Sequence, residues 1–216
     1  MPELAEWVVE PNCHSFPSLE EITCTDCPNL LAMHFYEVSC TNLRSLHVSG
    51  CPKMSLPSMP HTSTLTDLEV NRCDSEWLCY DGKKLVVREY GGALASHNLD
   101  KVEDMDVRRY GSLFLKELDG SIVFRSVKSL KLDASHLTSS KSSSSKVLNC
   151  FPALSVLHID HCEEECVMQF PSSSSLQKLS FRDCKGLVLV PVENGGEIQE
   201  DNSLLQSITI WGCGEL

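Results

Sequence analysis

A nine-residue phrase, L-x-x-L-x-L-x-x-C, recurs along this 216-residue chain and constrains its fold more than any other feature. Eight segments match the phrase: LEEITCTDC (19–27), LRSLHVSGC (43–51), LTDLEVNRC (65–73), VEDMDVRRY (102–110), VKSLKLDAS (127–135), LSVLHIDHC (154–162), LQKLSFRDC (176–184) and LQSITIWGC (205–213). Six of these eight segments end in Cys, and Tyr110 and Ser135 take the ninth position in the other two. With one exception, successive ninth positions lie 22 to 29 residues apart, so the chain is an array of repeats.

The L-x-L centre of the phrase alternates apolar and polar residues with the period of a β-strand that buries one face. A single unit cannot bury that face alone, so neighbouring units must stack their strands into a parallel sheet with a continuous core behind it. This is the pattern of a leucine-rich repeat. The sequence therefore predicts an α/β leucine-rich-repeat solenoid, a horseshoe whose concave face carries the parallel sheet.

The ninth-position cysteine stands where the chain turns away from the strand. A small residue that can be buried, with a weak S–H donor, can satisfy backbone groups in such a turn. This gives six of the twelve cysteines a structural explanation. CTDC (24–27) has the spacing of a metal-ligand pair but no second C-x-x-C completes a site, and CEEEC (162–166) has the wrong spacing for a zinc ribbon. We expect free thiols, no metal and no cofactor.

The segments between the phrases predict a convex side that is mostly irregular or short-helical. Prolines such as Pro28 and Pro52 exclude regular helices where they stand. The serine tracts at 139–146 and 172–175 have the composition of solvated loops. A row of full-length helices is therefore not expected.

One interval, the 37 residues from Cys73 to Tyr110, is longer than the rest. It contains the turn signal Asp81-Gly82 and a β-prone run that begins at Leu85. We interpret residues 74–101 as an insertion with an extra hairpin. A degenerate repeat is the alternative.

The extended phrase L-x-x-L-x-L-x-x-C-P-x-L/M, with irregular intervals and Leu-Pro between strands, resembles one family closely. It is similar to the leucine-rich-repeat domain of plant intracellular immune receptors of the coiled-coil/nucleotide-binding/leucine-rich-repeat type found in grasses. The stretches TNLRSLHVSGCPKMSLPSM (41–59) and SLLQSITIWGCGEL (203–216) carry most of this likeness. The resemblance implies that residues 1–216 are a single domain of about eight repeats and a fragment of a larger disease- or insect-resistance receptor.

The resemblance also implies a function. The repeat domain of such a receptor recognises a pathogen or insect effector, or a modified host protein, and restrains the receptor's own nucleotide-binding domain. The chain has no phosphate-binding Gly-Lys-Ser/Thr loop, so that nucleotide switch is not part of it. The implied location is the cytoplasm or the nucleus. The implied role is a non-catalytic recognition and autoinhibitory module that activates defence.

The main alternative is the substrate-recognition repeat domain of an F-box ubiquitin ligase. Those proteins also place Cys at the ninth position of the repeat. Their repeats continue into a helical segment of regular length, whereas this chain has prolines and serine loops there. An F-box or a nucleotide-binding domain upstream in the full-length gene would separate the two.

Charge and hydropathy exclude several other classes. The formal net charge of −12 argues against binding to nucleic-acid backbones. No apolar run approaches the length of a membrane span, and the first residues lack the basic and apolar regions of a signal peptide. A flat repeat face offers no pocket for a catalytic triad, so we expect no enzyme.

In this fold, side chains that alternate with the buried L-x-L positions point out of the concave face. The candidate partner-binding residues there are Asp67, Glu69, Asp104, Asp106, Arg108, Lys131, His158, Lys178, Arg182 and Trp211. If the third and fourth segments stack directly, the four acids form one acidic group, which we expect to hold the switch domain or a basic ligand. Lys178 and Arg182 make the later repeats more basic. Trp211 either contacts a partner or packs against a further repeat.

Overall fold

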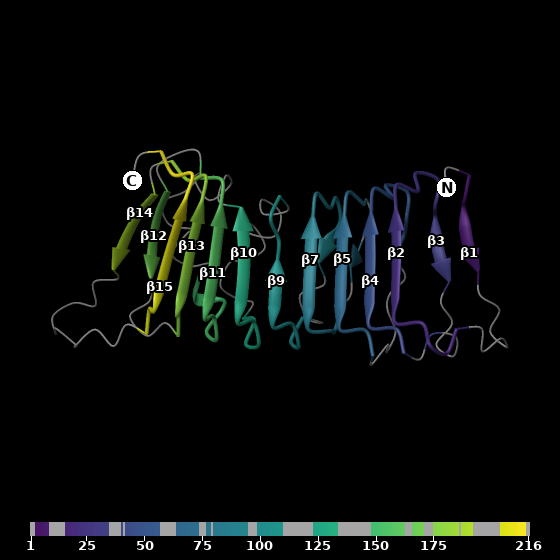
Figure 1. Cartoon of the computed structure of the whole chain (residues 1–216), viewed down its shortest axis with the longest axis horizontal. Helices are drawn as coiled ribbons and strands as arrows, with labels where there is room; N and C mark the ends of the chain where they lie inside the picture. The colour runs from purple at the N-terminus through teal and green to yellow at the C-terminus, as the bar shows by residue number, and fades with distance from the viewer. Residues whose placement is uncertain are drawn as a thin grey trace. The chain divides into compact units, whose positions relative to one another are not determined.

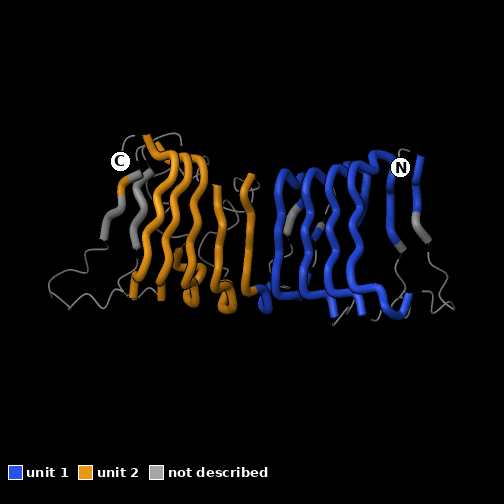
Figure 2. The backbone as a smooth tube through the Cα atoms, in the orientation of Figure 1, with its two compact units in different colours: residues 1–102 blue, residues 103–216 orange. Residues whose placement is uncertain are grey.

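The computed structural model describes residues 3–8, 16–34, 40, 42–56, 64–73, 77–78, 80–94, 99–109, 123–133, 148–162, 166–170, 175–185, 187–191 and 204–214. The chain divides into two compact units, residues 1–102 and residues 103–216 (Figure 2). Both units are built in the same way, from one row of parallel strands with shorter strand pairs elsewhere in the unit (Figure 1).

Unit 1 contains a row of four parallel strands that pair in register. In order along the row they are β2 (Glu21–Thr25), β4 (Ser45–Ser49), β5 (Asp67–Asn71) and β7 (Lys84–Arg88). Shorter parallel pairs join β1 (Glu6–Val8) to β3 (Ala32–His34) and β6 (Trp77–Leu78) to β8 (Ala93–Leu94). Where the structure describes the returns between the strands of this row, at β3 and β6, the chain is extended and does not form a long helix.

Unit 2 repeats this arrangement with five strands. They are β9 (Asp104–Asp106), β10 (Ser129–Asp133), β11 (Val156–Asp160), β13 (Lys178–Arg182) and β15 (Ser207–Trp211), and each pairs in parallel with the next. A separate parallel pair joins β12 (Cys166–Phe170) to β14 (Leu187–Pro191).

The core of each unit contains the apolar residues of most L-x-L centres. In-register pairing aligns Leu46 with Leu68 in unit 1 and Leu130 with Leu157 in unit 2, and each of these four side chains is at most 1% exposed. Residues between the buried positions keep more exposure, as the alternating pattern of β4 and β5 shows. The expected solenoid with a parallel sheet is confirmed. In the part of the chain that the structure describes, helix is confined to a turn at 148–149, so the short-helical part of the expected convex side is not seen there.

Every strand of the main rows that continues into a described turn does so through a residue with left-handed backbone geometry. These residues are Asp26, Gly50, Arg72, Glu89, Arg109, His161, Asp183 and Gly212, with φ between 46° and 68°. Each is the eighth residue of its repeat, directly before the ninth-position Cys or Tyr. The turn therefore has one recurring conformation, which glycine and a few polar residues adopt most easily.

The ninth-position cysteine closes this turn, as the sequence predicted. Cys27, Cys51, Cys73, Cys184 and Cys213 each place Sγ 3.4–3.6 Å from the carbonyl oxygen two residues earlier, to which the S–H donates. Cys51, Cys73 and Cys184 are fully buried. The nine cysteines whose side chains the structure describes are all free thiols.

The interval 74–101 contains a strand of the main row, which corrects its interpretation as an insertion with a hairpin. Strand β7 pairs with β5 in the same register that joins β4 to β5, Glu89 has the recurring left-handed φ, and Tyr90 is buried at the ninth position. The degenerate-repeat alternative fits these facts. Its first position is Gly82 instead of Leu, and the Tyr80 ring fills the space that a side chain there would need.

No helix in the described ranges is long and apolar enough to cross a membrane.

Candidate functional site

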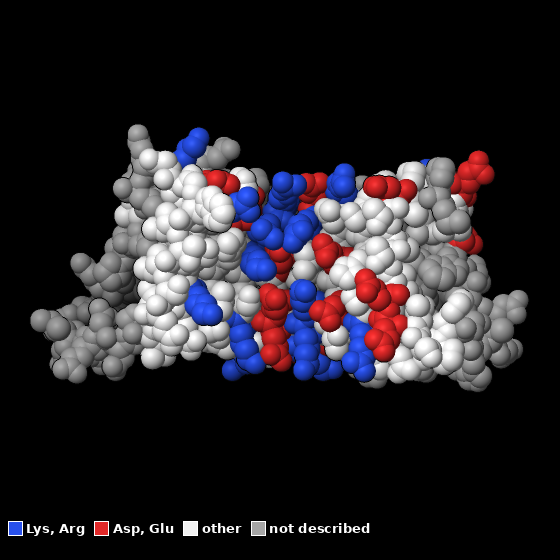
Figure 3. All heavy atoms as spheres, viewed as in Figure 1, with Lys and Arg blue, Asp and Glu red and all other residues white. Residues whose placement is uncertain are grey.

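The surface of interest is the sheet face opposite the core, which we call the open face. It carries the strand positions that alternate with the buried ones. All ten residues predicted from the sequence occupy such positions: Asp67 and Glu69 on β5, Asp104 and Asp106 on β9, Arg108 just after β9, Lys131 on β10, His158 on β11, Lys178 and Arg182 on β13, and Trp211 on β15. In Figure 3, acidic and basic residues are interleaved on this face.

In unit 1 the predicted acids face basic residues of β7. Asp67 Oδ1 lies 4.0 Å from Lys84 Nζ, and Glu69 Oε1 lies 3.7 Å from Arg88 Nη1. The other oxygen of Glu69 lies 3.2 Å from His47 Nδ1. These pairs are partly exposed, so each contributes little to stability, but together they neutralise the two carboxylates.

His47 also links Glu69 to a serine. Ser45 Oγ lies 2.7 Å from His47 Nε2, so the three residues have the connectivity of a nucleophile, a base and an orienting acid. Both β4 and β5 have a paired strand on each side, so their backbone amides are engaged in the sheet and none is aimed as an oxyanion donor. Ser45, His47 and Glu69 therefore form a chain of polar contacts, and we do not propose a catalytic role for them.

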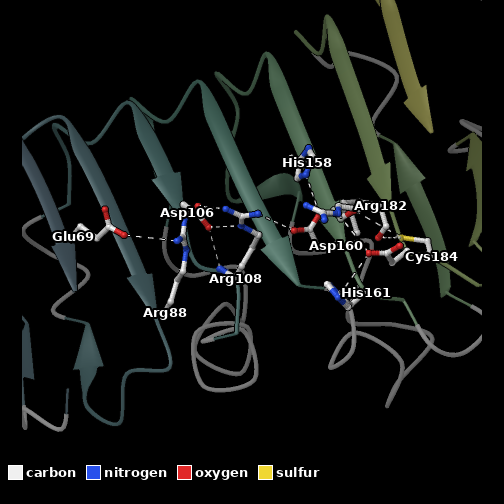
Figure 4. A network of polar contacts seen from close by, with 11 residues as sticks. Glu69, Arg88, Asp106, Arg108, His158, Asp160, His161, Arg182 and Cys184 are labelled. Carbon is white, nitrogen blue, oxygen red and sulfur yellow. Dashed lines mark hydrogen bonds and ion pairs between the residues drawn. The ribbon is translucent and has the colours of Figure 1, made fainter. Parts of the chain in front are cut away.

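In unit 2 the open face is organised around Arg108, as Figure 4 shows. Its guanidinium donates two hydrogen bonds to Asp106, from Nε to Oδ1 at 2.8 Å and from Nη2 to Oδ2 at 2.7 Å. Its third nitrogen, Nη1, donates to Asp160 Oδ2 at 2.9 Å. Arg108 therefore connects β9 with β11, passing over the intervening strand β10. We call Asp106, Arg108, His158 and Asp160 the Arg108 cluster.

The carboxylates of the Arg108 cluster are buried although they belong to the open face. Asp106 and Asp160 are each 3% exposed. A buried carboxylate requires compensating partners, and the planar guanidinium provides them with bidentate geometry. The hydrogen bonds from Arg108 to Asp106 raise the pKa of the guanidinium above its ordinary value, desolvation opposes this, and Asp160 adds to the rise. Arg108 is a permanently charged bridge.

His158 completes the cluster. Its Nε2 lies 2.8 Å from Asp160 Oδ1, which is close enough for an ion pair when the ring is protonated. That oxygen has no partner with hydrogen-bond alignment, so the contact is electrostatic and sensitive to the ring's orientation. Strand pairing places Asp133 of β10 directly beside Asp160 of β11, and Asp133 is 8% exposed.

The later strands of unit 2 differ from the cluster in exposure. Lys178 is exposed and has no ion-pair partner among the residues that the structure describes. The Arg182 side chain is 57% exposed and lies 3.5 Å from Asp183. Trp211, 73% exposed, stands opposite Arg182 in the register of β13 and β15. These three side chains are available to a partner without breaking a buried network.

The predicted acidic group is not one surface built by direct stacking of the third and fourth segments, because β7 is the neighbour of β5. Asp67 and Glu69 belong to unit 1 and are paired with β7, and Asp106 belongs to unit 2 and is paired with Arg108. Asp104 retains one buried oxygen without a hydrogen-bond partner. Lys84 and Arg88 were missed because the repeat phrase was not recognised in GKKLVVREY (82–90).

Asp160 is the third residue that the site prediction missed. The alternation of strand residues puts Asp160 on the open face, but nothing in the sequence marks it as a partner of Arg108, which is 52 residues away in the chain. A comparison of the seventh residue of each repeat would have indicated this pairing. The seventh residues lie side by side on neighbouring strands, and in unit 2 they are Arg108, Asp133, Asp160 and Arg182.

No family model, curated protein or solved structure matches this chain. Among the residues that the structure describes, no group of three or more His, Cys, Asp or Glu could hold a metal ion.

Proposed function

We propose that this chain is a leucine-rich-repeat protein-recognition module of a plant intracellular immune receptor, which binds an effector or host protein through its open face and restrains the receptor's nucleotide-binding domain. The repeat phrase and its resemblance to such receptors support the proposal. Extended returns at β1, β3, β12 and β14 also favour this class over an F-box ligase, whose repeats return through helices.

The observation that carries the recognition role is the exposed basic and aromatic surface of β13 and β15. We call Lys178, Arg182 and Trp211 the β13–β15 surface. Trp and Arg are frequent in the energetically dominant part of protein interfaces. Here they stand on paired strands, which hold them in place before a partner arrives. The positive charge of β13 favours an acidic segment of the partner.

The acids Asp67, Glu69 and Asp106 are weaker candidates for the contact, because each already has a basic neighbour in the molecule. Binding a basic ligand would require those internal pairs to be replaced. Binding of a basic ligand by these acids, which the sequence suggested, is therefore the alternative that the following test must distinguish.

The test uses the chain with two charge-reversal variants. Lys178→Glu/Arg182→Glu changes the β13–β15 surface, and Asp67→Lys/Glu69→Lys changes the acids of β5. Proteins captured from pathogen- or insect-challenged plant tissue, and the nucleotide-binding domain encoded by the full-length transcript, are measured for binding at low and moderate salt. We expect the β13 variant to lose binding, most strongly at low salt, while the β5 variant retains it.

A matched control reverses two exposed cations outside the open face, Lys101→Glu/Lys128→Glu, and should bind like the unmodified chain. Loss of binding in the β5 variant alone would restore the acidic contact. An F-box in the full-length transcript would contradict the receptor assignment.

A further inference from the structure

Two lysines on the open face of unit 2 have no counter-ion in the described part of the chain. Lys131 lies on β10 and Lys178 on β13, with β11 between them. Neither forms an ion pair or a side-chain hydrogen bond with another described residue. Lys84 and Lys128, by contrast, each lie beside a carboxylate. Because the chain carries a net charge of −12, two unneutralised cations so close together are a local exception.

The neighbours of Lys131 in the sheet do not neutralise it. Strand pairing places Lys131 between Asp106 of β9 and His158 of β11. Both carboxylate oxygens of Asp106 already accept hydrogen bonds from Arg108. The Nε2 atom of His158 lies 2.8 Å from Asp160 Oδ1 and so belongs to the same cluster. The ammonium group of Lys131 is therefore available to an anion from outside the chain.

The lysines belong to a patch formed by the first and third residues of β10, β11 and β13, which we call the Lys131–Lys178 surface. Its residues are Ser129, Lys131, Val156, His158, Lys178 and Ser180. All six side chains are partly or fully exposed. The surface contains two cations and no acid, and Asp104 of β9 stands at its border beside Ser129. Val156 is its one apolar residue.

The two lysines stand at a defined separation on the sheet. They are two strand spacings apart, and they differ by two residues along the strands, because Lys178 is level with Val156 and Lys131 with His158. Their Cα atoms are therefore about 12 Å apart. An extended segment rises about 13 Å over four residues and directs residues i, i+2 and i+4 to the same side. Side chains at i and i+4 can thus reach both lysines, while the side chain at i+2 lies over β11.

We propose that the Lys131–Lys178 surface binds an extended acidic segment of a partner protein, with the pattern acid-x-apolar-x-acid. The two acids pair with the lysines, and the apolar side chain contacts Val156 and the ring of His158. Charge complementarity selects this segment over a basic one, and the net charge of the chain opposes the long anionic backbone of a nucleic acid. The inference rests on the proposed recognition function and specifies the partner sequence that this function selects.

The first test uses two synthetic peptides of the same composition. The probe is Gly-Gly-Glu-Thr-Leu-Thr-Glu-Gly-Gly, and the comparison peptide, Gly-Gly-Glu-Glu-Leu-Thr-Thr-Gly-Gly, has adjacent acids. NMR titration of the isotope-labelled chain at low salt measures both affinities and identifies the amides that shift. We expect the probe to bind at least about threefold more tightly, to shift amides of β10, β11 and β13, and to weaken with added salt. Equal affinities, or shifts confined to other strands, would overturn the proposal.

Charge exchange tests the two contacts directly. Lys131→Glu/Lys178→Glu should weaken binding of the probe at least about tenfold, and should instead bind a peptide in which both Glu are replaced by Lys. Lys128→Glu/Lys185→Glu is the matched control, because it changes the net charge equally at two exposed sites outside the surface, and it should bind the probe like the unmodified chain. Equal weakening in both double variants would show that only net charge matters and would overturn the proposal.

A single variant separates this inference from the proposed function. Binding of Lys131→Glu to the partner captured from challenged plant tissue is compared with that of Lys178→Glu/Arg182→Glu. Loss of binding in both variants supports the inference. Loss in the β13 variant alone would overturn it and leave the proposed function intact, whereas full binding by both would contradict the proposed function as well.

Discussion

At the scale of single residues, Arg108 explains why acids can be buried on the open face of unit 2. Its three donor nitrogens satisfy Asp106 and Asp160 on two strands that are not neighbours. A lysine has one ammonium group and could not contact both carboxylates with the same geometry. The residue is therefore a structural bridge as well as a member of the open face.

Replacing Arg108 by Ala should lower the free energy of unfolding by about 3–5 kcal/mol, because it removes the guanidinium that donates three hydrogen bonds to two buried carboxylates. Arg108→Lys should recover only part of the loss. Urea denaturation at neutral pH measures both. Arg182→Ala is the control, since that side chain is 57% exposed and its loss should change stability by less than about 1 kcal/mol. A similar loss from both alanine variants would contradict a special role for Arg108.

Burial raises the pKa of the Cys184 thiol from 9.0 to about 11. The unfolded chain therefore loses this proton at lower pH than the folded chain, and the resulting stabilisation is complete below pH 9. We expect stability to fall as the pH rises through the range from about 9 to 11. Cys184→Ala should flatten this part of the curve of unfolding free energy against pH. An unchanged alkaline slope would assign the effect to other groups.

At the scale of elements, the recurring unit is a five-residue strand followed by a left-handed turn. Gly50 has φ of 66°, and a Cβ added there would overlap Asp26 Oδ1 of the neighbouring coil. Asp26 in turn donates its backbone N–H to Ser49 O at 2.9 Å, so the turns of adjacent coils are in direct contact. Glycine at this position allows the two turns to approach.

Gly50→Ala should therefore destabilise the chain by about 1–3 kcal/mol, through the strained φ and the overlap with Asp26. Gly214→Ala is a matched control, because nothing lies within 4 Å of its Cβ position and its φ is not positive. Thermal unfolding followed by circular dichroism compares the two. Equal melting temperatures would mean that the turn can relax without loss.

The buried strand positions allow a second comparison. Leu157→Ala in β11 should cost about 2–5 kcal/mol, because the side chain is fully buried. Ile210 also occupies an L-x-L position, in β15, but its side chain is half exposed. Ile210→Ala should therefore lower the free energy of unfolding by a clearly smaller amount. Denaturant titrations provide both values. Equal losses would show that β15 is covered in solution. The serine tract 139–146, expected to tolerate deletion, lies outside the described residues.

The sequence predicted the strands well where the repeat phrase was complete. Strand β4 matches its L-x-L centre, and the role of Cys51 as a buried S–H donor was expected from its place in the turn. The β-prone run of strand β7 was recognised, but its place in the main row was missed because Gly82 and Tyr90 replace the first and ninth residues of the phrase. The Tyr80 ring fills the space left by Gly82, and its hydroxyl lies within hydrogen-bond distance of the backbone oxygens of Thr66 and Lys84, at 2.5 and 2.9 Å. Tyr80 lies outside the nine-residue phrase, so a search for the repeat could not show that it replaces the missing leucine.

The candidate site was predictable in its positions and not in its pairings. Alternation placed every candidate on the open face, because strand geometry fixes the side on which a residue lies. Whether Asp106 is free or bound depends on Arg108 and on Asp160, two strands away, and thus on the register of the stack. The mistaken neighbour of β5 produced the mistaken acidic group.

At the scale of the whole molecule, we expect all twelve cysteines to be thiols in freshly purified protein. The nine cysteines with described side chains are free, and those at the ninth position already use their S–H groups within the turns. Alkylation in denaturant without reductant, followed by mass measurement, should give twelve adducts per chain. Two or more native disulfides would contradict the proposed location in a reducing compartment.

The recurring left-handed turn also has a genetic consequence. Because each described turn passes through a residue with the same left-handed backbone geometry, a stretch of gene that runs from one turn to the next encodes an exchangeable cassette. Gain or loss of such a cassette would move the later open-face residues by one strand spacing, about 4.8 Å, while every L-x-L centre still faces the core. A single-codon insertion inside a strand would instead turn the remaining strand residues to the opposite face. Recombination between turns is thus the route by which this gene could alter its surface without unfolding its product.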